Sequence, residues 1–284
     1  HTKGNTHRFI TTPRDLATYV HHDALYESYL NACLLMLGMG IPFDPDIPFQ
    51  RKDRDDHQQG FAHFGGPHIL SLVTEVATRA LKAVRFQKFN IHRRLRPEVL
   101  AARLSKHKHL DVKELNAMVD ELQPMLDKVR SRNETDQDLR GCNYLLPMAF
   151  CEGSPMHPAY GAGHATVAGA CVTVLKAFFD SNHPLDATMK GANYAFVPCK
   201  NGMELEAIKI QPNCELTVEG ELNKLASNIS IGRNWAGVHY FSDYIESLRM
   251  GEQIAIGILE EQKLMYGENF SMTIPLFDGG TLRV

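Results

Sequence analysis

The stretch Ser227-Asn-Ile-Ser-Ile-Gly-Arg233-Asn-Trp-Ala-Gly-Val-His239-Tyr-Phe-Ser-Asp243 joins two apolar helical patterns, and the rest of the chain is organised around it. Its informative part is an arginine followed six residues later by a histidine. A permanently charged planar donor held beside an imidazole suits a tetrahedral oxyanion. Arginine and histidine also fall close together by chance on many protein surfaces. The meaning of this pair therefore depends on whether other loops supply matching cations and imidazoles.

The composition is typical of a soluble globular protein. Of 284 residues, 44% are apolar and 22% are charged, so the chain can bury a sizeable core. The net charge of −3 gives no reason to expect nucleic acid or an anionic membrane as a partner. The sequence contains no run of 18 apolar residues and no visible signal peptide, so we predict no membrane span, and the compartment stays open.

The six cysteines show no close CxxC spacing. We therefore expect buried free thiols rather than a disulfide framework. Pairing of Cys142 with Cys151, or of Cys199 with Cys214, is the alternative.

Helical signals recur along the chain. Thr12, Pro13 and Asp15 form a helix start, and the apolar spacing predicts one long helix or two joined helices over 13–37. Pro67 opens another helix. Its predicted apolar face consists of Ile69, Leu72, Val73, Val76, Ala80 and Val84.

Further helices are expected in the second half of the chain. Asp111 and Glu114 begin one that we expect Pro124 to interrupt. Later apolar patterns predict helices over about 164–179, 222–231 and 245–264, and residues 204–210 with 215–218 are predicted to form a short β-hairpin. The expected fold is mainly α: a helical bundle with a small β-hairpin insertion, in which residues 1–284 form a single helical domain.

Three loops beside long helices carry cations or imidazoles. Lys88 and Arg96 lie in a strongly basic stretch that Pro97 ends. A proline- and glycine-rich segment runs into a helix at Gly163-His164, where free amides and the helix dipole favour an anion. With Arg233 and His239, these loops supply cations for an oxyanion such as phosphate or vanadate, one imidazole that can bond its central atom, and another that can move protons.

An irregular segment over 41–66 carries an acidic cluster that includes Asp53 and Asp55. Alternating oxygen side chains on a loop can hold Ca²⁺, although the spacing is not that of an EF-hand. A solvated loop is the alternative interpretation.

The order Lys88-x7-Arg96-Pro, Gly163-His164 at a helix start, and Arg233-x5-His239 resembles the three-part signature of vanadium-dependent haloperoxidases. Their site is shared with the type 2 phosphatidic acid phosphatases and the bacterial class A acid phosphatases. The seven-residue gap after Lys88 and the phrases around it are similar to the bromoperoxidases of red algae and related cyanobacterial enzymes. The resemblance covers the whole chain, but only as the C-terminal half of such an enzyme.

The resemblance implies a role for each matching residue. His239 would bond vanadium, and Lys88, Arg96, Arg233 and the Gly163 amide would hold the equatorial oxygens of vanadate. His164 would be the acid and base. His157 matches an additional active-site histidine, and Arg85 matches an arginine linked to halide preference. A loop histidine without a special role is the alternative for His157.

Two positions depart from the family pattern. Ala162 stands where the family commonly has a serine that donates to a vanadate oxygen, and Gly232 stands where it often has another serine. A lost donor to a charged oxygen costs about 1.5–3 kcal/mol. We therefore expect weaker vanadate binding or lower turnover, and little effect from Gly232, which need not face the oxyanion.

The implied activity is vanadate-dependent oxidation of bromide or iodide by hydrogen peroxide to hypohalous acid, which halogenates small organic acceptors. The metal would act as a Lewis acid, and the family suggests a homo-oligomer. One alternative is a phosphomonoesterase with His239 as the nucleophile and His164 protonating the leaving group. Another is an inactive or assembly fragment, which the missing upstream half and Ala162 would explain.

Overall fold

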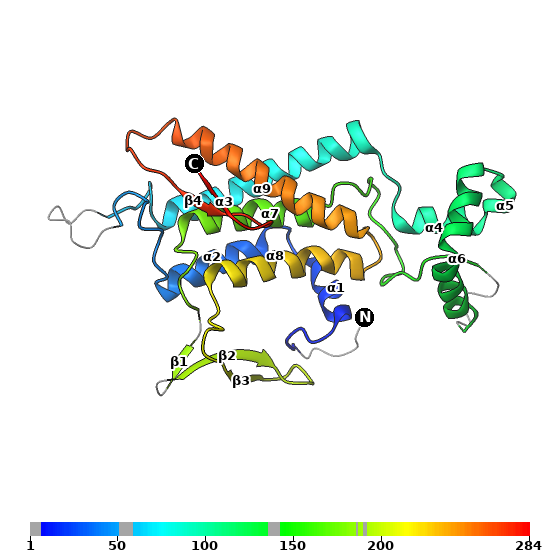
Figure 1. The fold of residues 1–284 in the computed structure, drawn as a ribbon, viewed down its shortest axis with the longest axis horizontal. Helices are drawn as coiled ribbons and strands as arrows, with labels where there is room; N and C mark the ends of the chain where they lie inside the picture. Colours follow the sequence, from blue (N-terminus) through cyan, green and yellow to red (C-terminus); the bar gives the residue numbers. More distant parts are fainter. Residues whose placement is uncertain (1–6, 51–58, 136–142, 186, 190–191) are drawn as a thin grey trace.

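The computed structural model describes residues 7–50, 59–135, 143–185, 187–189 and 192–284. Its main body is a bundle of long helices, and three further helices extend from one end of it (Figure 1). The bundle helices are α1 (Pro13–His22), α2 (Glu27–Met39), α3 (Gly66–Phe86), α7 (Gly163–Phe178), α8 (Val218–Trp235) and α9 (Phe241–Lys263). The mainly α fold predicted from the sequence is therefore confirmed.

Helix α7 is the centre of the bundle. Every residue from Ala165 to Phe178 is buried, and the helix packs against α3, α8 and α9. Two glycines allow the backbones of α7 and α9 to approach closely. A Cβ at Gly169 or at Gly251 would lie 2.1 Å from a backbone oxygen of the other helix. Only glycine fits such a contact, so this pair sets how closely the middle parts of α7 and α9 pack together.

The predicted helices are present, with one correction. The helical pattern over 13–37 divides into α1 and α2, and the predicted apolar face of α3 is buried throughout. The expected break at Pro124 was wrong, because α6 (Lys113–Glu134) continues through it. Pro124 is exposed, so water can bond the backbone carbonyl that the missing N–H leaves free.

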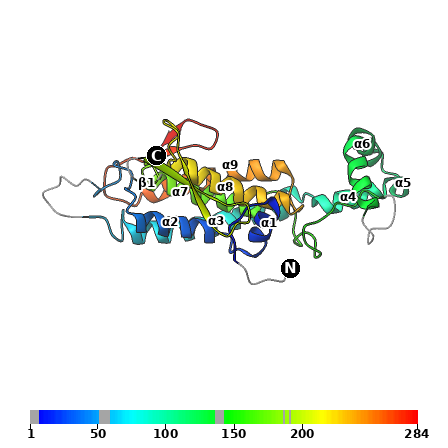
Figure 2. The same cartoon turned by 90° about the horizontal axis from the view of Figure 1, so that it is seen from below.

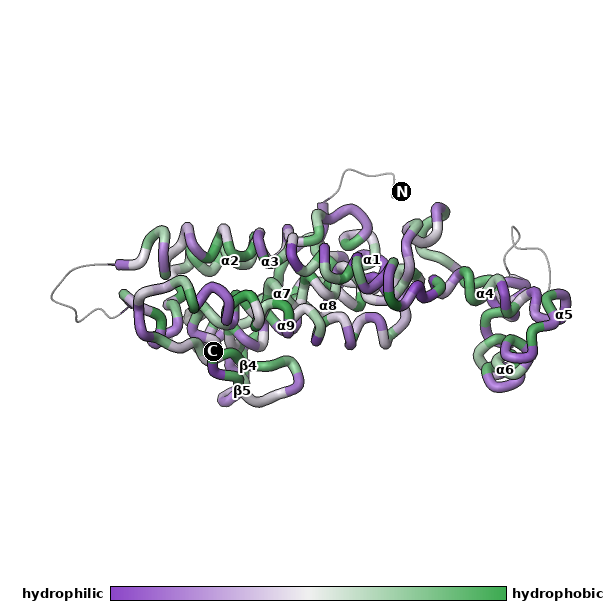
Figure 3. The backbone as a smooth tube through the Cα atoms, turned by 90° about the horizontal axis from the view of Figure 1, so that it is seen from above, coloured by the Kyte–Doolittle hydropathy of each residue, from purple (hydrophilic) through white to green (hydrophobic). Residues whose placement is uncertain are grey.

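The region from α4 (Pro97–Ser105) through α5 (His107–Leu110) to α6 forms an arm that projects from the bundle in both views (Figures 1 and 2). The arm has a small core of its own, made of Leu104, Leu115, Val119 and Leu126. In the hydropathy-coloured trace, hydrophobic and hydrophilic segments alternate within the arm as they do along the bundle helices (Figure 3). The arm is therefore a satellite of the bundle with its own amphipathic packing.

Two small antiparallel sheets flank the bundle. One has the order β1 (Ala187–Met189), β2 (Ala192–Pro198) and β3 (Leu205–Lys209), and the other pairs β4 (Thr273–Pro275) with β5 (Thr281–Arg283). The predicted insertion is present, but its predicted pairing was wrong, because β3 pairs with β2. Residues 215–218 lead into α8 instead: the Thr217 side chain caps that helix by accepting from Gly220 N.

Several sequence expectations concern single residues or short segments. Asp53, Asp55 and Cys142 lie outside the described residues. The thiols of Cys33, Cys151, Cys171, Cys199 and Cys214 are free, so the alternative of a Cys199–Cys214 disulfide was wrong. Among the described residues, no group of three or more His, Cys, Asp or Glu side chains could hold a metal ion. In the same part of the chain, no helix has the length and apolarity needed to cross a membrane.

Candidate active site

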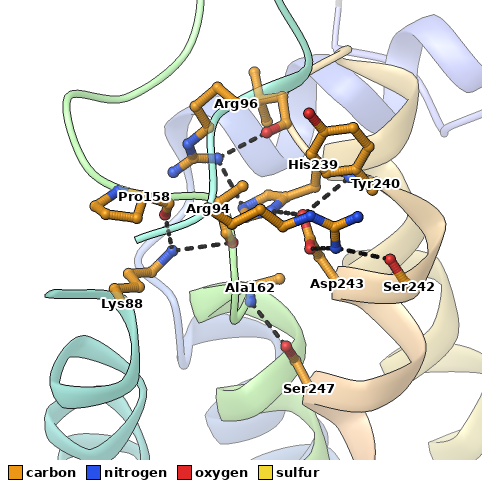
Figure 4. Close-up of polar contacts among 12 residues, drawn as sticks. Lys88, Arg94, Arg96, Pro158, Ala162, His239, Tyr240, Ser242, Asp243 and Ser247 are labelled. Carbon is orange, nitrogen blue, oxygen red and sulfur yellow. Dashed lines mark hydrogen bonds and ion pairs between the residues drawn. The ribbon is translucent and has the colours of Figure 1, made fainter. Parts of the chain in front are cut away.

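Three loops meet where α3 ends, where α7 begins and where α8 passes into α9 (Figure 4). The first follows a short π-helix, η1 (Gln87–His92), the second runs over 157–162, and the third over 236–240. The loops bring together side chains that are up to 151 residues apart in the sequence, from Lys88 to His239.

Lys88 lies on η1 and is 2% exposed. π-Helical turns often occur at functional sites, and this one ends at Arg93, whose backbone is left-handed (φ 45°). The Lys88 ammonium donates to the carbonyl oxygens of Pro158 (2.7 Å) and Ala159 (3.4 Å). An ammonium has three N–H donors, so one remains for a further acceptor. Burial, followed by the charge of Arg96, lowers the pKa of Lys88 to about 7.

Arg96 ties the three loops together from the start of α4. Its Nε donates to His157 O (2.8 Å) and its NH1 to Val238 O (2.8 Å). The same guanidinium lies 3.0 Å from His239 Nε2 and 2.9 Å from His157 Nδ1. Because arginine can only donate, both ring nitrogens must be acceptors. Burial, and then the charge of Arg233, lowers the pKa of Arg96 to about 10, so it remains cationic at neutral pH.

His239 follows a tight turn at Gly237, which adopts a left-handed conformation (φ 83°) that favours glycine. The imidazole is 7% exposed, and its Nδ1 lies 3.1 Å from Oδ2 of the fully buried Asp243. A carboxylate accepts, so Nδ1 carries the proton and the Nε2 lone pair faces Arg96. Burial lowers the pKa of His239 to about 3, so the imidazole is neutral at pH 7. The arrangement presents a neutral nitrogen ligand among cations.

Asp243 accepts more than one hydrogen bond. It also accepts from Tyr240 N (3.0 Å), which closes a capping box at the start of α9. Burial alone would raise the pKa of Asp243, but the hydrogen bonds from His239 and Tyr240 outweigh it, and the pKa lies below its usual range. Asp243 therefore remains a carboxylate and fixes the His239 tautomer.

Arg233 and His164 join this group through the end of α1. Arg233 is 7% exposed, and its NH1 donates to Val20 O (3.0 Å). His164 Nε2 lies 2.9 Å from Oδ1 of Asp23, whose side chain is 2% exposed. Burial lowers the pKa of Arg233, and the charge of Asp23 partly offsets this effect. One buried carboxylate thus orients His164 and lies within electrostatic range of Arg233.

The start of α7 lies in the same place. Gly163 is the first helical residue, so its amide belongs to the N–H groups that have no partner within the helix. Ala162 before it is 1% exposed, and its backbone N–H donates to Ser247 Oγ on α9 (2.8 Å). This contact and the close packing of α7 on α9 fix the start of α7 against α9.

The two remaining sequence candidates, His157 and Arg85, differ in position. His157 is half-buried and bonded to Arg96; burial, and then the charge of Lys88, lowers its pKa to about 4. Arg85 is exposed, and its guanidinium lies 5.3 Å from the ring centroid of Phe89. Its charge acts on both Lys88 and His157. His157 is thus part of the hydrogen-bonded group, whereas Arg85 lies at its rim.

The charge balance of the site favours an oxyanion. Lys88, Arg96 and Arg233 are buried cations, and the two carboxylates beside them, Asp23 and Asp243, already bond histidines. Within the part of the chain that the structure describes, Arg233 Nε is buried and has no hydrogen-bond partner. Such a donor is costly unless an acceptor meets it. A tetrahedral oxyanion such as vanadate fits this set: it would accept from the guanidinium and ammonium groups, and its central atom could bond His239 Nε2.

The sequence interpretation missed Asp23 and Asp243. Asp243 ends the opening stretch, four residues after His239, and lies in the first turn of α9. An acidic residue in the first turn of a helix is a common helix-start signal, which could have drawn attention to it. Asp23 carries no such signal, because it meets His164 only through the packing of α1.

Comparison with known proteins finds relatives whose sequences match nearly the whole of this chain. A family model described as the VCPO second helical-bundle domain matches residues 129–267. The chain is 55% identical over 288 residues to a vanadium-dependent bromoperoxidase of Corallina pilulifera, and 35% identical over 284 residues to one of Ascophyllum nodosum. Each alignment covers 98% of this chain, but 47% and 48% of the relatives.

A solved bromoperoxidase structure has a similar fold. The second vanadate-dependent bromoperoxidase of Ascophyllum nodosum, described as homohexameric, superposes with a TM-score of 0.82 at 29% identity. The superposition covers 98% of this chain and 49% of that one. The chain therefore spans about half the length of the relatives that it matches.

Proposed function

We propose that this chain, which belongs to the vanadium-dependent bromoperoxidase family, carries the vanadate site of an enzyme that oxidises bromide or iodide with hydrogen peroxide. The reaction consumes hydrogen peroxide, a halide ion and one proton, and it yields hypohalous acid and water. The oxidised halogen then halogenates small organic acceptors. Residues 1–284 would act as one helical domain of a homo-oligomer, by analogy with the homohexameric relative.

The observation that carries the proposal is a group of three buried cations around a neutral imidazole. A phosphate-like anion would satisfy Lys88, Arg96 and Arg233. A site for electrostatic anion capture alone would not need a nitrogen lone pair. The Asp243 carboxylate fixes that lone pair on His239 Nε2, where it can bond a metal. The combination favours vanadate over a simple anion.

Bound vanadate supplies a Lewis acid that activates hydrogen peroxide for attack by halide. The side chains supply the rest. His239 Nε2 is the proposed vanadium ligand, and Arg96, Arg233 and the Gly163 amide would hold oxygens of the vanadate. Lys88 keeps one N–H donor beyond its two carbonyl contacts, and with it would hold an oxygen of the bound group and stabilise negative charge that develops there.

His164 is the proposed acid and base. Its Nε2–H donates to Asp23, which leaves Nδ1 as the ring nitrogen that exchanges the proton consumed in the reaction. Asp23 holds the ring in the orientation for this exchange, as a carboxylate does beside other catalytic histidines. At the rim, Arg85 supplies positive charge where the halide approaches, and His157 holds Arg96 in place.

The direct test is to titrate the purified chain with vanadate and to measure bound vanadium together with bromination of a phenolic acceptor in hydrogen peroxide and bromide. We expect activity that requires vanadate and that His239→Ala abolishes. Hydrolysis of a phosphomonoester without bromination would favour the phosphatase alternative. A folded chain with neither bound vanadium nor activity would favour the fragment alternative. Light scattering during size-exclusion chromatography of the same sample would report the oligomeric state.

A further inference from the structure

Arg94 lies in the first site loop and, like Arg96, contacts both of the other two, through Ala159 and Tyr240. Its guanidinium NH1 donates to Asp243 Oδ1 (2.8 Å) and to Ser242 Oγ (2.8 Å) at the start of α9 (Figure 4). Its carbonyl oxygen accepts from Ala159 N (2.9 Å), in the loop whose carbonyls bind Lys88. Arg94 itself precedes Arg96 by two residues. Neither the sequence motif nor the proposed chemistry assigns it a role.

The contacts divide the two oxygens of Asp243 between different donors. Oδ1 accepts from Arg94, whereas Oδ2 accepts from His239 Nδ1 and Tyr240 N. A carboxylate that can rotate would exchange these partners. Arg94 prevents this rotation by holding Oδ1, and the position of Oδ2 then determines the orientation of the imidazole.

The Arg94 side chain is itself fixed from two sides. Its guanidinium carbon lies 4.1 Å from the ring centroid of Tyr240, and the hydrogen bond to Ser242 fixes the plane of the fork. Arginine can stack on an aromatic face and donate within its plane at the same time, whereas an ammonium cannot. The contact therefore depends on the shape of the guanidinium as well as on its charge.

We propose that Arg94 is a positioning residue for the vanadate site: through Asp243 it holds the His239 imidazole with Nε2 directed at the oxyanion. The expected effect on vanadate affinity rests on the proposed function. The expected effect on the orientation of the His239 imidazole does not. A plain surface ion pair would contribute little, because the Arg94 side chain is 40% exposed. The proposal differs from that interpretation in predicting an effect on His239 rather than on stability.

The test compares Arg94→Ala and Arg94→Lys with a matched control, Arg93→Asn, in the full chain. Arg93 is the exposed neighbouring arginine, and asparagine tolerates its left-handed backbone (φ 45°). The first readout is vanadate affinity by equilibrium dialysis. The second is the low-field proton NMR signal of His239 Nδ1–H in the ligand-free protein, assigned by its loss in His239→Gln.

We expect Arg94→Ala to weaken vanadate binding about tenfold, the lower end of the effect of partners that orient metal ligands, since Arg94 acts through Asp243. The His239 signal should broaden or vanish. Free guanidinium, which can reach the exposed part of this contact, should restore both readouts, and Arg94→Lys should restore them in part. The control should match the parent protein.

Two results would overturn the proposal. One is an Arg94→Ala protein whose His239 signal and vanadate affinity equal those of the parent. The other is a loss that neither guanidinium nor lysine restores, which would indicate general damage to the loops. If the parent chain binds no vanadate, the proposed function fails, but the NMR signal of His239 still decides the role of Arg94.

Discussion

Replacing Asp243 by asparagine should uncouple the imidazole from the site with a minimal change in shape. The carboxylate is fully buried and accepts from Arg94 NH1 (2.8 Å), His239 Nδ1 (3.1 Å) and Tyr240 N (3.0 Å). An asparagine side chain has one oxygen and one NH₂ group, so it cannot accept at both positions. In either orientation, the NH₂ group faces a donor.

Each orientation has a definite consequence for the site. With NH₂ toward Arg94, two donors face each other, and the ion pair is lost. With NH₂ toward His239, the imidazole can accept at Nδ1 only by moving its proton to Nε2. That proton would then face Arg96, which can only donate, and it would occupy the lone pair meant for vanadium. The second orientation destroys the metal ligand, and the first loses a charged hydrogen bond that is worth about 1.5–3 kcal/mol.

We therefore expect Asp243→Asn to weaken vanadate binding about 10- to 100-fold, the range for residues that orient metal ligands. Sulfate is the informative comparison, because it needs the cations but no bond from His239. Removing a negative charge leaves the site more positive, so sulfate affinity should be kept or increased. Equilibrium dialysis with both anions measures this difference. Asp278→Asn, which removes only an exposed partner of Arg249, is the matched control.

An equal loss of vanadate and sulfate binding would refute this reasoning, because it would mean that the substitution disturbs the cations rather than the imidazole. Unchanged vanadate binding in a folded Asp243→Asn protein would also refute it, since the tautomer of His239 would then not depend on the carboxylate.

Ala162→Ser should tighten vanadate binding by about ten- to a hundredfold if its hydroxyl recovers a charged hydrogen bond of about 1.5–3 kcal/mol; unchanged dialysis constants would contradict this. Sulfate affinity should fall as pH rises through about 7, where Lys88 loses its proton, and Lys88→Met should show weak, pH-independent binding. Burial lowers the pKa of Lys176 from 10.5, its value in the unfolded chain, to about 8. Between these two pH values the unfolded state binds a proton that the folded state lacks, so the free energy of unfolding rises with pH. In urea titrations, Lys176→Met should remove up to about 1.4 kcal/mol per pH unit of that slope. Leu115→Ala should increase hydrogen exchange within 97–134 and leave α7 protected, because the arm has its own core; a uniform increase would show that arm and bundle unfold together.

The helices and the cations of the site could be predicted from the sequence because both leave local signals. The apolar face of α3 follows helical spacing, and all of its predicted residues are buried. Lys88 and Arg96 stand out because a basic stretch is unusual in a chain of net negative charge. Gly163 and His164 follow a glycine-rich loop at a helix start, which is a signal of the same local kind.

What could not be predicted depends on contacts between distant segments. Asp23 reaches His164 across 141 residues, and nothing near Asp23 distinguishes it from a surface carboxylate. The choice of β2 as the partner of β3 follows from the use of Thr217 as a helix cap, which competes with the predicted strand over 215–218. From the sequence, the projecting arm can be predicted only as separate helices. Hydrophobic periodicity indicates which face of a helix is buried, but it does not indicate which other element covers that face.

The buried cations Lys88, Arg96 and Arg233 lower the stability of the ligand-free fold, and for the same reason they increase the affinity of the site for an anion. Burial lowers the pKa values of Lys88, Arg96 and Arg233, which means that folding disfavours their charged forms. An oxyanion reverses this effect, because its negative charge raises those pKa values again. Its binding free energy therefore includes the relief of a penalty that the bundle imposes through α3, α7 and α9. For this reason the site belongs at the end of a well-packed bundle: a looser scaffold would let the cations move apart into solvent, and the relief available to the anion would fall with the penalty.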